Sequence, residues 1–179
     1  MSTVLLLTAA LPLTPITIDQ SVPFRTTGEY TLSARLFSQT IDDERQIAIA
    51  IGNTILVTER QRDFDHAYLV PTRRGYDYLI VETTFGGPGT CLHHQDIDIY
   101  LIDSFSDGGS VIQNKKSVST GGLLACTEEY AACGCGVWEA EVRFSYLENG
   151  LLQLSTQHST QLHGGGPAES PPPPVVLEL

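Results

Sequence analysis

The chain has 179 residues, enough for one domain with a sizeable hydrophobic core, so neither disulfides nor a metal ion is needed merely to fold it. It carries 10 Lys and Arg against 21 Asp and Glu, and the net charge of −11 excludes nucleic acid as an expected partner because it repels phosphate backbones. A hydrophobic fraction of 41% excludes disorder along the whole chain, and no apolar run reaches the roughly 18 uninterrupted residues of a membrane-spanning helix.

The N-terminal segment, residues 1–15, is apolar and punctuated by prolines. Small residues near Ala10 suit a signal-peptide cleavage site, although no Lys or Arg precedes the apolar run. The alternatives are a first strand of the domain itself and a strand donated to a neighbouring subunit. The assembly hypothesis names the apolar residues of this segment and of a weak strand at 16–19, namely Val4, Leu5, Leu6, Leu7, Leu11, Leu13, Ile16 and Ile18.

The next segments are predicted to be strands. Residues 29–37 are the first clear candidate. Residues 46–51 and 54–59 are expected to form a hairpin around Gly52 and Asn53. Apolar residues nowhere recur at sustained helical spacing, and only residues 42–46 are expected to make one helical turn.

A mixed cluster of side chains follows the strand candidates at 66–70 and 76–84. Residues 91–98 hold one thiol, two imidazoles and two carboxylates, at the junction between a Gly-rich loop and a strand predicted at 95–102. On that strand Asp96 and Asp98 share a face, with their Cα atoms about 6.5–7 Å apart, a spacing at which two carboxylates could share a calcium ion. The plainer interpretation is a strand face exposed to solvent.

Zinc is the second cation that this junction suggests. Cys91 and His93 point to the same side of an extended chain, and zinc binds thiolate and imidazole. The metal hypothesis, with calcium or zinc as the ion, therefore names Cys91, His93, Asp96 and Asp98, whereas our principal expectation is that the protein uses no cofactor.

The four cysteines gather in two Gly-rich loops, and their spacing is not that of a zinc finger or a zinc ribbon. A bridge between Cys133 and Cys135 would close a strained ring, so two pairings remain. They are Cys91–Cys133 with Cys126–Cys135, and Cys91–Cys135 with Cys126–Cys133. Oxidised cysteines would place the protein outside the cytoplasm. Four reduced, buried thiols in a cytosolic protein are the alternative.

The strongest hairpin signal lies near the C-terminus, after a weaker strand candidate at 110–119. In residues 137–146 apolar side chains occupy the even positions from Trp138 to Tyr146, which predicts a strand with one solvated face. The Asn149-Gly150 pair tolerates the backbone of a tight turn, so residues 151–156 should return antiparallel.

From residue 164 the composition turns to Gly and Pro, which predicts a disordered tail over 164–179 and a domain over 16–163. Many short strands separated by turn residues predict an all-β fold, an antiparallel two-sheet sandwich or jelly roll.

No sequence motif of a known catalytic chemistry is present. We therefore expect a non-catalytic extracytoplasmic domain that acts as a binding or self-assembling structural subunit. The acidic surface favours a basic protein or a cation as partner, and self-association is included. A carbohydrate platform would need Tyr100 and Tyr130 exposed beside the two aspartates. The alternative function is a metal-dependent or cysteine-based enzyme with its site at residues 91–98.

Overall fold

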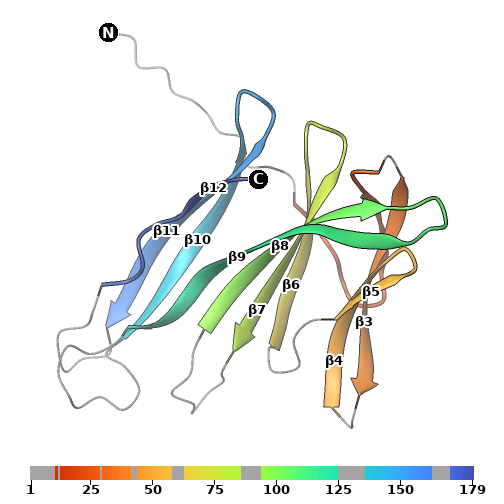
Figure 1. Cartoon of the computed structure of the whole chain (residues 1–179). Helices are drawn as coiled ribbons and strands as arrows, with labels where there is room; N and C mark the ends of the chain where they lie inside the picture. Colours follow the sequence, from red (N-terminus) through yellow and green to blue (C-terminus); the bar gives the residue numbers. More distant parts are fainter. Residues whose placement is uncertain are drawn as a thin grey trace.

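The computed structural model describes residues 11, 13–28, 30–41, 44–57, 63–85, 94–124, 136–162 and 170–179. Within these residues every regular element is a strand, and the strands form two antiparallel sheets (Figure 1). The expected all-β, two-sheet fold is confirmed. The sandwich describes it better than the jelly roll, because neighbouring strands follow chain order in both sheets except where β1 joins β6.

The larger sheet has eight strands in the order β1-β6-β7-β8-β9-β10-β11-β12. The smaller has four, in the order β2-β3-β4-β5. The strands of the larger sheet are β1 (Thr14–Pro15), β6 (Asp63–Pro71), β7 (Asp77–Phe85), β8 (His94–Ser104), β9 (Ser110–Leu124), β10 (Gly136–Tyr146), β11 (Leu152–Leu162) and β12 (Val176–Glu178). Those of the smaller sheet are β2 (Ser21–Arg25), β3 (Thr31–Ile41), β4 (Glu44–Ile51) and β5 (Thr54–Val57).

The smaller sheet confirms one predicted hairpin and corrects another prediction. Strands β4 and β5 meet at Gly52, whose φ of 57° lies in the left-handed region that glycine adopts without strain. The helical turn expected over 42–46 is wrong for its described part, because β4 already begins at Glu44. Pairing of Ile41 with Glu44 extends the β3–β4 hairpin to its tip, and those ladder hydrogen bonds compete with a single helical turn.

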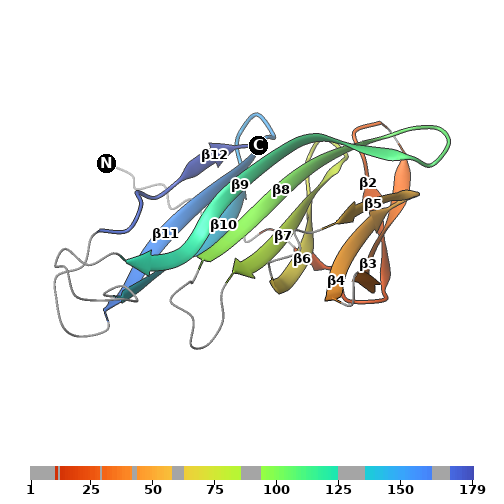
Figure 2. The ribbon, with the colours of Figure 1, turned by 60° about the horizontal axis from the view of Figure 1, so that its bottom comes forward.

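The two sheets enclose a first hydrophobic core. Figure 2 shows the smaller sheet beside one end of the larger sheet. The core side chains occupy alternate positions of the strands that contribute to it, as a sandwich requires. The smaller sheet contributes Val22, Phe24, Ala34, Leu36, Ile49 and Ile51, and the larger contributes Ala67, Leu69, Leu79, Val81 and Ile102.

The opposite face of the larger sheet is also buried, in a second core. Leu152 and Leu154 of β11 belong to one cluster with Ile97 and Ile99 of β8, although two strands separate β8 from β11 in the sheet. The Tyr146 hydroxyl at the end of β10 donates a hydrogen bond to the Pro71 carbonyl oxygen of β6 at 2.6 Å. The larger sheet therefore curls, so that β10 and β11 face β6–β8 across the second core. Figure 2 shows the long strand β9 between the two halves of this sheet.

The strand predicted at 137–146 is confirmed as β10, and its inward face packs on the second core. Tyr146 pairs with Leu152 across the predicted Asn149-Gly150 turn, where Gly150 has a φ of 81°. The return strand, β11, extends to Leu162, farther than the predicted 156.

The described end of the C-terminal tail is ordered, which corrects the prediction of disorder there. Strand β12 pairs with β11, and Val175, Leu177 and Leu179 pack on the second core. The amide of Leu179 donates to the Leu152 carbonyl oxygen at 2.8 Å. These three residues occupy alternate positions, so they share one side of the short segment, whereas Val176 on the other side is exposed.

Part of the N-terminal segment lies on its own domain. Strand β1 pairs with β6, Ile16 is only 4% exposed in the first core, and Leu11 packs on the second core. These contacts agree with the first-strand alternative, whereas Leu13 and Ile18 are exposed. Donation of the segment to a neighbour stays a prediction, and its residues Val4, Leu5, Leu6 and Leu7 lie outside the described part of the chain.

Candidate functional site

The two aspartates of the 91–98 cluster share one face of β8, as predicted, but that face is not solvated. Asp96 and Asp98 are each 8% exposed. Strand β8 lies between β7 and β9, and side chains of both neighbouring strands crowd its carboxylates. The expectation of a solvent-facing pair is therefore wrong, because alternation fixes which residues share a face but not what covers that face.

Asp98 is held by three protein donors. Lys115 Nζ lies 2.8 Å from Oδ2, the Tyr100 hydroxyl donates to the same oxygen at 3.2 Å, and Ser117 donates to Oδ1. Burial, followed by the charge of Asp98, raises the pKa of Tyr100. Burial would lower the pKa of Lys115, but its contacts with Asp98 and Tyr100 together raise it. Asp98 thus forms an ion pair with Lys115 that links β8 to β9.

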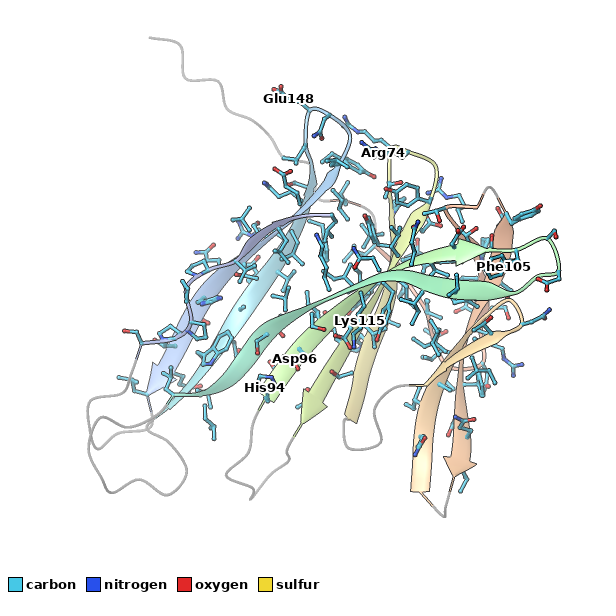
Figure 3. All side chains as sticks on the ribbon, viewed as in Figure 1. Arg74, His94, Asp96, Phe105, Lys115 and Glu148 are labelled. Atoms are coloured by element: carbon cyan, nitrogen blue, oxygen red, sulfur yellow. The ribbon has the colours of Figure 1, made fainter. Side chains whose placement is uncertain are left out.

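Asp96 forms a separate pair with His94 at the start of β8 (Figure 3). His94 Nε2 lies 2.9 Å from Asp96 Oδ1 and 3.4 Å from the Ser119 hydroxyl oxygen. A catalytic triad needs one ring nitrogen for the nucleophile and the other for the carboxylate. Because both contacts of His94 use Nε2, this Ser-His-Asp set does not have the arrangement of a triad.

The metal hypothesis is only partly within the described residues, because Cys91 and His93 lie outside them. Among the residues that the structure does describe, no group of three His, Cys, Asp or Glu side chains is placed to hold a metal ion. Both oxygens of Asp98 already accept hydrogen bonds from protein donors, which leaves this carboxylate poorly suited to calcium.

A cleft of about 440 Å³ opens between β10 and strands β6–β8. Pairing aligns His66, Glu82 and Ile97 in one row across β6, β7 and β8, with Thr84 and Gln95 in the next row. Because the sheet curls, β10 faces these rows from across the cleft. The described lining residues are His66, Glu82, Thr83, Thr84, Gln95, Asp96, Ile97, Thr120, Ala140 and Val142.

A smaller apolar pocket of about 120 Å³ adjoins the cleft. Glu82, Ile97 and Val142 line both spaces, so the cleft is the polar mouth of an apolar recess. The remaining described residues of this pocket are Leu13, Tyr68, Ile80 and Phe144.

Glu82 occupies the junction between the polar and the apolar space. The Tyr68 hydroxyl donates to Glu82 Oε2 at 3.5 Å, and the ring centroid of Tyr68 lies 6.0 Å from that of His66. A carboxylate has about four acceptor sites, so it can take a further donor beside its protein contacts. The junction therefore combines negative charge with aromatic faces.

Of the predicted site residues that the structure describes, only Asp96 belongs to the cleft lining, although its side chain shares the other face of β8 with Asp98. Sequence reasoning missed His66 and Glu82. A signal for Glu82 was available, because it follows Tyr78 and Ile80 at alternate positions and so interrupts an apolar face with a carboxylate.

The four cysteines lie outside the described residues, and so does Tyr130, so their roles stay predictions. The strand ends that flank the cysteines are described. Phe85 pairs with His94, His94 with Gly122, and Leu124 with Gly136. Both cysteine-bearing intervals therefore interrupt the larger sheet at the same end. The carbohydrate platform loses one of its elements, because Tyr100 is half-buried and bonded to Asp98.

Comparison with protein-family models, with curated proteins and with solved structures found no match to this chain. Over the described ranges, the chain forms no helix long and apolar enough to cross a membrane.

Proposed function

We propose that this protein is a non-catalytic binding domain that acts outside the cytoplasm and takes its ligand in the cleft between β10 and β6–β8. The observation that carries the proposal is the cleft itself, with its polar mouth and apolar recess. A volume of about 440 Å³ falls within the usual range of ligand sites, and a few polar groups on an apolar pocket are their usual composition.

Binding is favoured over catalysis by the contacts of the described residues. The ion pair of Asp98 with Lys115 joins β8 to β9, that of Asp96 with His94 lies within β8, and His94 does not relay between Ser119 and Asp96. A role as an assembly subunit through residues 4–18 has less support, because Ile16 is buried in the chain's own core. A protein partner would use the same cleft by inserting a side chain.

A bulky side chain at Ala140 is expected to block the cleft. Ala140 lines it from β10, so Ala140→Trp should fill the space and lower the affinity of cleft ligands about tenfold or more, a loss of roughly 1.4 kcal/mol. Saturation-transfer NMR with a fragment library measures this. The matched control is Gln157→Trp, which adds the same side chain at an exposed position of β11. Identical fragment binding by both variants and the parent protein would exclude the cleft as the site.

The proposed location predicts oxidised cysteines. The strands that flank both cysteine-bearing intervals are neighbours, which suits a bridge between them. Protein from its native source, denatured and alkylated without reductant, should therefore gain no alkyl group, and reduction should expose four thiols. Intact mass spectrometry distinguishes the two states. Four alkylated thiols before reduction would contradict the extracytoplasmic location.

A further inference from the structure

We propose that the ligand group recognised by the cleft is a primary ammonium ion carried on a short alkyl chain. This inference rests on the proposed function, because it names the chemistry of the ligand that the cleft would take. It assigns the ammonium ion to Glu82, at the junction of the two spaces, and the alkyl chain to the apolar pocket.

The charge of the lining selects a cation. Among the described residues around the cleft and the pocket, Glu82 supplies a carboxylate, and neither Lys nor Arg is present. The carboxylate of Asp96 lies on the other face of β8, because Asp96 pairs with Thr83 whereas Ile97 pairs with Glu82. The whole chain adds a net charge of −11, which raises the local concentration of cations and repels carboxylates and phosphates. An anionic ligand of the same shape would have to lose its hydration beside the negative charge of Glu82.

The aromatic residues of the pocket add a second attraction for an ammonium ion. Tyr68 and Phe144 line the pocket together with Glu82. An ammonium group within about 6 Å of an aromatic centroid is attracted by the negative face of the ring, most strongly where water is excluded. A carboxylate beside two aromatic rings therefore favours a cation over a neutral alcohol of equal length.

The apolar pocket sets the length of the chain. Its volume of about 120 Å³ is roughly four times the ~30 Å³ that one water molecule occupies in the liquid, so it holds roughly four methylene groups. A butyl chain has that length, and so does the four-carbon stem of lysine. Ile80, Ile97 and Val142 would cover the chain.

The test is an NMR titration of the full chain with n-butylammonium, butan-1-ol and butyrate, which share one alkyl chain and differ in charge. Butylammonium should bind roughly tenfold more tightly than the alcohol, and butyrate more weakly still, because a hydrogen bond to a charged group is stronger than one to a neutral group. Equal or tighter binding of the alcohol or of butyrate overturns the inference.

Glu82→Gln should reduce the butylammonium affinity roughly tenfold and leave that of butan-1-ol unchanged. The matched control is Glu141→Gln, which removes one carboxylate from an exposed position of β10. An equal loss in both variants would show that only net charge matters and would overturn the assignment to Glu82. If Glu82→Gln does not fold, a salt titration of the parent protein tests the charge of the recognised group instead, because added salt should weaken the binding of butylammonium and not that of butan-1-ol. An equal salt dependence of both ligands would overturn the inference.

Two further titrations distinguish a small free amine from a protein lysine as the source of the ammonium group. Tighter binding of free butylammonium than of Nα-acetyl-lysine-N-methylamide indicates a small amine, and the reverse order indicates a lysine of a protein partner. The failure of this inference is separate from that of the proposed function. If the fragments whose binding is lost in Ala140→Trp are neutral or anionic, only the assignment to an ammonium group is overturned. If fragment binding does not change in Ala140→Trp, the cleft itself is overturned as the binding site.

Discussion

Phe24→Ala is expected to lower the free energy of unfolding by about 3–5 kcal/mol, the usual loss when a fully buried phenylalanine is truncated. Phe24 has no exposed surface and lies in the first core, between the two sheets. The truncation removes both its apolar burial and its contacts with the larger sheet. Denaturant unfolding followed by the fluorescence of Trp138, the only tryptophan, measures the loss.

A matched control for Phe24 is available on the neighbouring strand. Phe37 of β3 is half-buried outside the first core, with the guanidinium carbon of Arg35 5.9 Å from its ring centroid. Phe37→Ala removes the same side chain but less buried surface, so the loss of stability should be clearly smaller. Equal losses for the two variants would contradict the placement of the first core between the sheets.

The features that could be predicted from the sequence are those set by local alternation. Residues 137–146 alternate strictly and are followed by Asn149-Gly150, so strand, turn and pairing all follow from neighbouring residues. The assignment of an all-β fold follows in the same way, because it sums many such local signals. The five apolar-rich residues after the prolines are too few to show such a pattern, and strand β12 becomes evident only once β11 is beside it.

The features that could not be predicted depend on how the larger sheet curls. Alternation places Asp96 and Asp98 on one face of β8, but only the positions of Lys115 and Ser117 on β9 show that this face is covered. The cleft has the same origin, because Ala140 on β10 and Glu82 on β7 line one space only through the curvature of the sheet. Sheet curvature is a property of many strands together, so the candidate site was found by structure.

A half-buried ion pair joins the two sheets and provides the second large expected effect. Asp77, 7% exposed at the start of β7, accepts hydrogen bonds from the backbone amide of Arg25 at 2.9 Å, from its Nε at 3.0 Å and from its Nη2. The hydrogen bond to Asp77 is the main cause that raises the pKa of Arg25. Arg25 belongs to β2, so this one carboxylate ties the smaller sheet to the larger one.

Asp77→Ala is expected to lower the free energy of unfolding by about 2–3 kcal/mol. Removing one partner of a buried pair costs about 3–5 kcal/mol, and the value is reduced here because the Arg25 side chain is 42% exposed and can regain water. The matched control is Glu141→Gln, which breaks a similar two-bond contact with Arg143 on the exposed face of β10 and should leave the melting temperature unchanged. Asp77→Ala unfolding as the parent protein does would mean that this ion pair contributes nothing measurable to holding the two sheets together, and would contradict the prediction.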